Sequence, residues 1–231
     1  IDRTYIVNQV TQSGQVEAGG FVPSGVYDAD GADGDDFRTV GGDYYKPTDA
    51  DYEANCDEAR QLLADAGYPN GEGFPVVEYL YNTSDAHKAV AEALQFMWEE
   101  ELGVKVTLNN QEWAAFLQTR KDGDYSIARN GWIADYNDPI SFLDMWMTGG
   151  GNNDAQYAND DYDALIKQAK TTTDNAERMD LLHQAEDKLI GEDSVLAPLY
   201  FYTQKYMLAD GIEGMYYCPL GYFFFGYTHQ A

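Results

Sequence analysis

The sequence has 231 residues, 44% of them hydrophobic and 14% aromatic, enough for one substantial core or two small ones, and we expect one compact unit. Its 14 Lys and Arg against 40 Asp and Glu give a formal net charge of -26, so a phosphate backbone or an anionic membrane surface would repel it. We therefore exclude nucleic acid as a partner. No stretch approaches the roughly 18 consecutive apolar residues of a membrane-spanning helix, so the segment is expected to be soluble.

The first 52 residues combine a helix with an acidic, glycine-rich stretch. The chain opens on Ile1 rather than Met, and residues 4–10 read as the continuation of a helix, so we expect a fragment excised from a longer protein. Dense turn signals in residues 19–52 predict a long surface excursion without regular structure. The aspartates at 28–36 hint at calcium, but their spacing fails the EF-hand pattern, and an exposed acidic loop is the simpler interpretation.

The next hundred or so residues open with a β-α-β pattern. A capping-box sequence predicts a helix from Asn55 to Gly67. Residues 76–81 predict a strand, 85–102 an amphipathic helix and 104–108 a second strand. A helix between two strands is typical of a parallel pair joined by a crossover.

The alternation of helices and strands continues beyond this unit. In chain order, the expected elements are a helix at 113–117, a strand at 125–133, a helix opened by Asp138, a helix around 162–169, a helix capped by Asp174, and strands at 195–202 and 205–209. The pattern predicts an α/β fold with a mixed or parallel sheet flanked by helices. In such folds ligands bind at strand ends or between lobes.

Motifs for catalysis and metal binding are missing from the sequence. There is no Gly-x-Ser-x-Gly elbow, no phosphate-binding glycine loop with Lys and no His-Glu-x-x-His pair. Cys56 and Cys218 are too few and too far apart for a zinc site or a redox motif, and a disulfide between them stays open. We expect no enzyme, no cofactor and no metal.

Residues 125–136 carry the most informative pattern. In a strand, Arg129, Gly131, Ile133 and Asp135 would share one side. A glycine within a strand suits a place where another backbone approaches closely, as an extended peptide would. Main-chain hydrogen bonds would hold a peptide of any sequence, while Asp135 pairs with its α-amino group and a cation with its α-carboxylate.

The same region resembles a known family. Five groups of residues closely resemble the oligopeptide-binding proteins of ABC importers: 110–113, Arg120, 123–125, 127–129 and 131–139. Shorter matches extend from Ile1 to Tyr200, so the resemblance covers essentially the whole chain. It implies one lobe of a two-lobed clamp, like the periplasmic binding proteins of type II, cluster C.

The resemblance also implies how the chain is organised. Residues 1–231 would form a single lobe, the C-terminal ligand-binding lobe, with hinge-proximal segments near 1–25 and 205–231. An N-terminal lobe and a signal peptide would belong to the longer protein.

The resemblance assigns the main contacts of a bound peptide. The acid at Asp135 would receive the peptide amino terminus, and the backbone at Gly131 and Ile133 would bond the peptide main chain. Trp132 and Trp113 would line side-chain pockets. Without the resemblance, Asp135 would read as a surface acid near a helix start.

Three further residues, Arg129, Arg120 and His87, match family positions that neutralise the ligand carboxylate, with the choice depending on peptide length. Each also has a simpler interpretation. Arg129 could offset a neighbouring acid, Arg120 could complement a helix C-terminus, and His87 could be an exposed imidazole in the first turn of a helix. Asn130 departs from the small residue that is commoner at its position.

The expected function is therefore peptide binding for uptake. Its partners would be short peptides and the membrane permease subunits of an ABC importer, and the protein would be a monomer at an extracytoplasmic location, as a cell-surface lipoprotein or in a periplasm. Two alternatives stay open. The same fold binds other solutes, such as an oligosaccharide or a metal chelate, and a hydrolase could use two of the many carboxylates.

Overall fold

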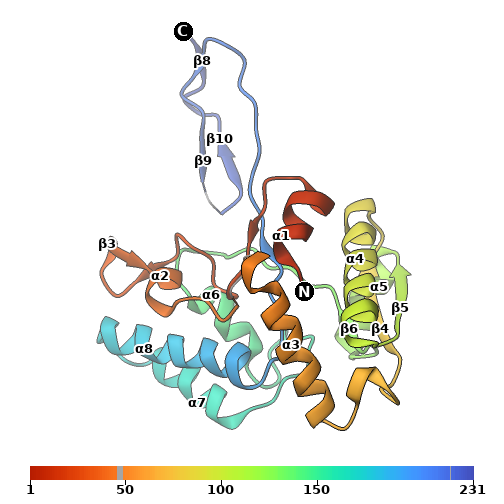
Figure 1. The fold of residues 1–231 in the computed structure, drawn as a ribbon. Helices are drawn as coiled ribbons and strands as arrows, with labels where there is room; N and C mark the ends of the chain where they lie inside the picture. The colour runs from red at the N-terminus through yellow and green to blue at the C-terminus, as the bar shows by residue number, and fades with distance from the viewer. Residues whose placement is uncertain (46–48, 219) are drawn as a thin grey trace.

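Two separate hydrophobic cores organise the chain, and a C-terminal extension projects away from both (Figure 1). The structure is a computed structural model that describes residues 1–45, 49–218 and 220–231. We call the two clusters the sheet core and the helix core. The sheet core is built from Ile6, Tyr79, Tyr81, Val90, Ala91, Leu94, Met97, Val104 and Val106. The helix core includes Val22, Phe37, Phe142, Leu143, Trp146, Tyr162, Ile166, Leu182 and Leu189.

The β-α-β unit surrounds the sheet core, as expected. Strands β4 (Val77–Asn82) and β5 (Val106–Gln111) pair in parallel, with Val77 opposite Val106, and α4 (Asp85–Leu102) connects them. The bounds of α4 match those expected from its periodicity, and its Leu94 and Met97 are buried. The short strand β6 (Ile127–Ala128) pairs with the other edge of β4, so the sheet has the order β5-β4-β6.

Three further helices belong to this half of the chain. They are α1 (Arg3–Tyr5) with its π-helical continuation Ile6–Thr11, α3 (Asp49–Asp65) and α5 (Trp113–Asp122). Helices at the first and third positions were expected, but the first does not continue a helix from upstream, because Asp2 caps it by accepting from the Tyr5 amide (2.7 Å). The prediction that the second helix starts at Asn55 was wrong, because α3 begins six residues earlier, at Asp49. Its first turns have tertiary contacts: Tyr52 donates to Glu101 (3.5 Å) and Cys56 is buried. Such contacts extend a helix beyond a capping signal.

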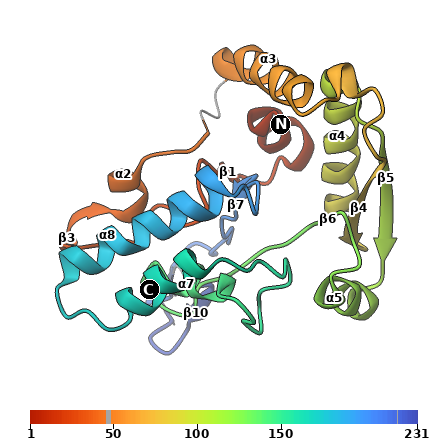
Figure 2. The ribbon, with the colours of Figure 1, turned by 90° about the horizontal axis from the view of Figure 1, so that it is seen from below.

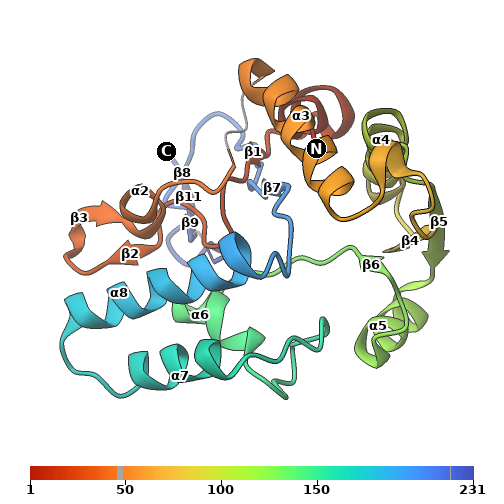
Figure 3. The ribbon, with the colours of Figure 1, turned by 60° about the horizontal axis from the view of Figure 1, so that its bottom comes forward.

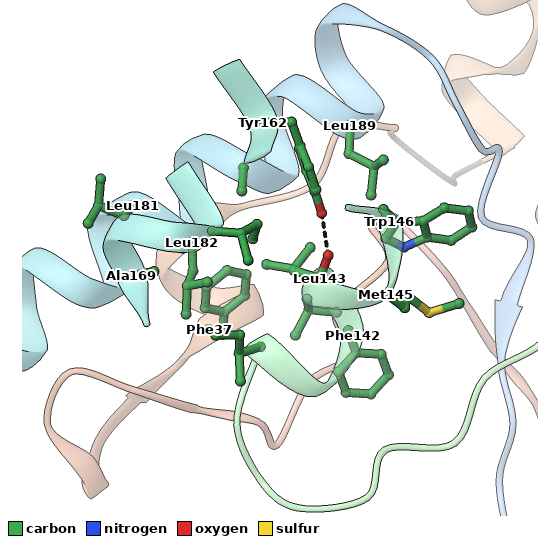
Figure 4. Close-up of a cluster of buried hydrophobic side chains, with 14 of the residues drawn as sticks. Phe37, Phe142, Leu143, Met145, Trp146, Tyr162, Ala169, Leu181, Leu182 and Leu189 are labelled. Carbon is green, nitrogen blue, oxygen red and sulfur yellow. Dashed lines mark hydrogen bonds between the residues drawn. The ribbon is translucent and has the colours of Figure 1, made fainter. Parts of the chain in front are cut away.

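The helix core lies between short helices from the second half of the chain (Figure 4). These are α6 (Ile140–Leu143) with the 3-10 turn Asp144–Trp146, α7 (Asp160–Ala169), and α8 (Asn175–Glu186) with the π-helical stretch Asp187–Glu192. Asp174 caps α8, as expected, by accepting from the amides of Ala176 and Glu177. The buried Tyr162 donates its hydroxyl to the Leu143 carbonyl (2.5 Å), which ties α7 to α6.

The expectation of an irregular surface excursion at residues 19–52 was wrong. This stretch contains β2 (Tyr27–Asp28) and β3 (Gly31–Asp36), which pair with each other, and α2 (Phe37–Gly41). Phe37 is fully buried in the helix core. Residues 46–48 of the stretch lie outside the described residues.

A buried ion pair holds this stretch against α8. Arg38 and Glu186, 6% and 0% exposed, form two hydrogen bonds of 2.9 Å each. Glu186 also accepts from the amides of Phe21 and Val22, both at 2.9 Å. These partners satisfy a carboxylate that would otherwise be costly to bury. Residues 21–22 and 37–38 are thus part of the core architecture, while Asp30, Asp33 and Asp35 of the acidic loop are exposed, as expected.

Two expected strands are much shorter than their patterns suggested, and a third is not formed. The expected strand 125–133 is regular only over β6, and 195–202 only over β7 (Tyr200–Phe201), which pairs with β1 (Val16–Glu17). Residues 205–209 have no regular structure. Alternating hydrophobicity permits a strand, but a ladder also needs a neighbouring strand in register. The α/β class is confirmed, although the sheets of the described residues have only two or three strands each.

The described residues of the C-terminal extension, 203–218 and 220–231, include two antiparallel ribbons. Strand β8 (Ile212–Glu213) pairs with β11 (His229–Gln230), and β9 (Tyr216–Cys218) pairs with β10 (Tyr222–Phe224). Large apolar side chains of this extension face solvent, among them Met207 (97% exposed), Tyr227 (79%), Phe225 (64%) and Tyr222 (63%). Figure 1 shows the extension reaching away from both cores.

Cys56 and Cys218 are both free thiols, so the disulfide that the sequence left open is not formed. Among the helices in the described ranges, none is long and apolar enough to cross a lipid bilayer. Within the same ranges, no three His, Cys, Asp or Glu side chains are grouped in a way that could hold a metal ion.

Candidate functional site

A segment without regular structure, residues 129–136, crosses from the sheet core to the helix core (Figures 2 and 3). We call it the crossing segment. It begins where β6 ends, and the Arg129 amide donates to the Leu80 carbonyl of β4 (2.8 Å). At its other end the Asp135 amide donates to Ser141 Oγ in α6 (2.9 Å). Each end is therefore attached to a different core.

The middle of the crossing segment has main-chain groups available for bonding. Within the described part of the chain, the amides of Trp132, Ile133 and Ala134 have no hydrogen-bond partner, and Ile133 is 71% exposed. The Gly131 amide differs, since it donates to the Asn130 side-chain oxygen (2.8 Å). Unpaired amides on an extended segment are the groups that another backbone uses when it adds alongside.

At the helix-core end, the Asp135 carboxylate is exposed and has no ion pair or hydrogen bond with any residue that the structure describes. The neighbouring acid Asp138 differs, because Arg178 neutralises it (2.7 Å). Asn137 accepts from the Tyr27 amide (2.8 Å) and so holds the adjoining loop. The backbone around Asp135 is anchored while its charge stays uncompensated.

At the sheet-core end, the Arg129 guanidinium contacts neutral groups. It donates to Asn82 Oδ1 (3.4 Å) and to the Tyr202 hydroxyl (3.2 Å). No carboxylate of the described residues lies within 4.0 Å of it. In a chain with 40 acids and 14 bases, a half-buried arginine without an acid is a group that can still receive an anion.

His87 lies beside this arginine. Its Nδ1 is 3.3 Å from the Asn82 carbonyl. Burial lowers the pKa of His87, and the positive charge of Arg129 lowers it further. The imidazole is therefore neutral at neutral pH, and Arg129 supplies the positive charge there. Burial also raises the pKa of the nearby Tyr79 to about 12, so this phenol stays protonated.

The charge of Arg120 is paired with a carboxylate of the same chain. Its Nε donates to Asp154 (2.7 Å), and the two side chains are 13% and 14% exposed. Its Nη1 donates to Asn130 Oδ1 (2.9 Å). Arg120 lies in the last turn of α5, where a positive charge also suits the helix dipole. The structure therefore places Arg120 near the crossing segment but with its charge already paired.

The two candidate tryptophans have different surroundings. Trp132 is half-buried against the helix core and donates its Nε1 to the Ser141 carbonyl (2.7 Å). Trp113, at the start of α5, is 53% exposed and stacks on Phe116, with ring centroids 5.8 Å apart. Both present apolar surface, but they come from different halves of the chain.

Sequence reasoning missed the residues that position the site: Asn82, Ser141 and Tyr202. Asn82 had a usable signal, because it is a polar residue at the carboxyl end of a buried strand, where α/β proteins bind ligands. Ser141 and Tyr202 had none, since their contacts depend on where distant segments pack.

Two hollows are lined by residues outside the crossing segment. One, of about 430 Å³, lies between α7 and α8 and involves Gln168 and Gln184. The other, of about 360 Å³, lies beside residues 148–158 and involves Lys121 and Tyr157.

Comparison with known proteins identifies relatives. Residues 1–154 match the family described as bacterial extracellular solute-binding proteins, family 5, middle part. The chain is 38% identical over 223 residues to the dipeptide-binding protein DppE of Bacillus subtilis, covering 96% of this chain and 39% of DppE. It is also 38% identical over 156 residues to the probable deoxycholate-binding periplasmic protein YgiS of Escherichia coli, covering 68% of this chain and 29% of YgiS.

The fold has solved counterparts. The crystal structure of Haemophilus influenzae OppA in complex with RPPGFSPFR superposes with a TM-score of 0.77 and 29% sequence identity, covering 93% of this chain and 40% of that chain. This chain thus spans about two fifths of the length of DppE and of Haemophilus influenzae OppA.

Proposed function

This chain belongs to the bacterial extracellular solute-binding proteins of family 5, and on that basis we propose that it binds peptides for uptake by an ABC importer. One observation carries the proposal: among the described residues, the Ile133 amide and the Asp135 carboxylate have no partner, and Arg129 has no acid partner. A peptide has the complementary groups, an ammonium, a chain of amides and a carboxylate. The dipeptide-binding protein DppE and the OppA that was crystallised with RPPGFSPFR are relatives whose ligands are in this class.

Recognition would proceed through the peptide backbone and termini. The Asp135 carboxylate holds the α-ammonium, the main chain of the crossing segment pairs with the peptide main chain, and Arg129 receives the α-carboxylate. The backbones of Arg129 and Asp135 are six positions apart, at most about 20 Å when extended, which suits peptides of about three to six residues. The protein acts by binding, without a chemical step.

The remainder of the site belongs to a second lobe. The chain spans about two fifths of its relatives, and an open lobe leaves one face of a bound peptide in water. The exposed aromatic side chains of residues 203–231 support a contact between this hinge-proximal segment and that lobe. Closure would exclude water and strengthen the pairing of charges.

This division of the site predicts weak binding by the 231 residues alone. In water the Asp135 pair contributes only about 0–1 kcal/mol. Calorimetry on the isolated chain, shown to be folded by thermal melting, should therefore give no sub-micromolar affinity for short peptides. A sub-micromolar dissociation constant would contradict the role of a second lobe.

The cellular setting follows from the family. The longer protein would act outside the cytoplasm, as a cell-surface lipoprotein or in a periplasm, deliver peptides to membrane permease subunits, and work as a monomer. The net charge of -26 favours solubility there.

A non-peptide solute is the second candidate, and the similarity to YgiS favours it. A bile acid such as deoxycholate has a carboxylate for Arg129 but no ammonium, so Asp135 would lack a partner. Oligosaccharides and metal chelates gain no specific support from the site. A carboxylate-dependent hydrolase of the glycosidase type needs two carboxylates, and the crossing segment has one, Asp135.

Ligand identity decides between these candidates. Mass spectrometry of the solute that copurifies with the longer, two-lobed protein should detect short peptides, and calorimetry should show that tetraalanine binds while deoxycholate does not. A copurifying glycan or bile acid, or deoxycholate binding without peptide binding, would overturn the proposal.

A further inference from the structure

The Asn130 side chain accepts a hydrogen bond from a main-chain amide that a bound peptide would need. Its side-chain oxygen accepts from the Gly131 amide (2.8 Å) and from Arg120 Nη1 (2.9 Å). Arg120 is itself held by Asp154 (2.7 Å), and both of these side chains are largely buried. The oxygen therefore has two donors, one of which is fixed by an ion pair. Rotating Asn130 away from Gly131 breaks both hydrogen bonds.

We propose that Asn130 determines peptide-length preference by capping the Gly131 amide, an inference that rests on the proposed function. An amide N–H has one hydrogen, so a ligand carbonyl and the Asn130 oxygen compete for it. A peptide long enough to reach Gly131 either displaces Asn130 or forgoes this hydrogen bond. A peptide that ends before Gly131 meets no such competition.

The register along the crossing segment sets which peptides reach the cap. An extended chain advances about 3.3 Å per residue, so a dipeptide whose ammonium is at Asp135 ends near Ile133, about 7 Å away. A tetrapeptide extends about 13 Å and reaches Gly131. The Arg129 side chain folds back over this glycine, because its Nη2 lies 3.2 Å from where a Cβ on Gly131 would stand. A tetrapeptide that reaches Gly131 thus presents its carboxylate to Arg129.

Two variants with opposite expected effects test the cap in the two-lobed protein. Asn130→Ala removes the competing oxygen, and tetraalanine should bind about fivefold more tightly, the value of one modest hydrogen bond. Dialanine should bind unchanged. Asn130→Asp retains an acceptor for Gly131 and Arg120 and adds a negative charge near the peptide carboxylate. It should weaken tetraalanine and leave dialanine unaffected.

A second readout needs no ligand. Amide hydrogen exchange, measured by NMR on the folded 231-residue chain, should accelerate at Gly131 in Asn130→Ala and stay slow in Asn130→Asp. An equal change for both peptides, weaker tetraalanine binding by Asn130→Ala, or unchanged exchange at Gly131 would each overturn the role of Asn130. Failure of wild-type protein to bind either peptide would instead overturn the proposed function, while the exchange data still report on the cap.

Discussion

The sheet core and the helix core are stabilised in different ways. Around the sheet core, β4 and β5 pair in parallel across a single connecting helix. Around the helix core, a buried ion pair joins Arg38 to Glu186, 148 positions apart, and holds the stretch that contains β2, β3 and α2 against α8. The half around the sheet core therefore depends on local periodicity, whereas the half around the helix core depends on a long-range polar contact.

The crossing segment is attached to both halves of the chain. Its Arg129 end is attached to β4, and its Asp135 end to α6. The separation of the two charges therefore depends on how the two cores are positioned relative to each other. Changes in either core should alter ligand selection as well as stability.

The largest expected effect would come from breaking the buried ion pair. Glu186→Gln keeps the shape of the side chain but leaves Arg38 charged and buried, which should cost about 3–5 kcal/mol in the free energy of unfolding measured with urea. In hydrogen exchange, residues 21–45 and α8 should lose protection while α4 retains it. The exposed Glu192 provides a control, because Glu192→Gln should change stability little. Uniform loss across both halves would show that they unfold as one unit.

Removing the charge at the helix-core end of the site comes next. Asp135→Asn in the two-lobed protein should weaken peptide binding by about 2–5 kcal/mol, because the buried ammonium loses its partner and keeps its desolvation cost. Calorimetry provides the measurement. Asp122→Asn, on the exposed surface of α5, is the matched control. An unchanged dissociation constant for Asp135→Asn would remove this residue from the site.

Removing the charge at the sheet-core end should have a smaller effect that depends on length. Arg129→Ala should weaken binding by about 1.5–3 kcal/mol, the value of hydrogen bonds to a charged group, for the peptides whose carboxylate reaches it. Calorimetry with alanine peptides of two to six residues would locate that length class. Arg129→Lys keeps the charge and should lose less. An equal loss at every length argues against a role in binding the carboxylate.

The smallest effect concerns pH. The pKa of His87 is lowered in the folded protein, so the unfolded chain binds the proton more readily, and stability is lost as pH falls through about 6.5, the ordinary value. His87→Gln should remove part of that loss. Urea midpoints at pH 7.5 and 5.5 measure it, with the exposed His229→Gln as control. The same pH dependence in wild type and His87→Gln would contradict the assignment.

Predictions from the sequence were more accurate for the half around the sheet core than for the half around the helix core. The bounds of α4 were predicted because its apolar spacing and the terminating Gly103, with φ of 66°, are local features. Residues 19–52 were misread as an irregular surface excursion because Glu186, which pairs with the buried Arg38, lies far along the chain. The roles of Asp135, Gly131 and Ile133 stay predictions.

The sequence by itself determined the β-α-β unit, the Asp174 cap of α8 and the charged residues near the crossing segment, because spacing and capping act within a few residues. Only the tertiary structure decided which of these charges is available. Arg120 and Arg129 are equivalent candidates in the sequence, yet Asp154 pairs with Arg120, while Arg129 contacts neutral oxygens. An ion pair forms where the fold brings two groups within a few ångströms, and sequence spacing does not encode that distance.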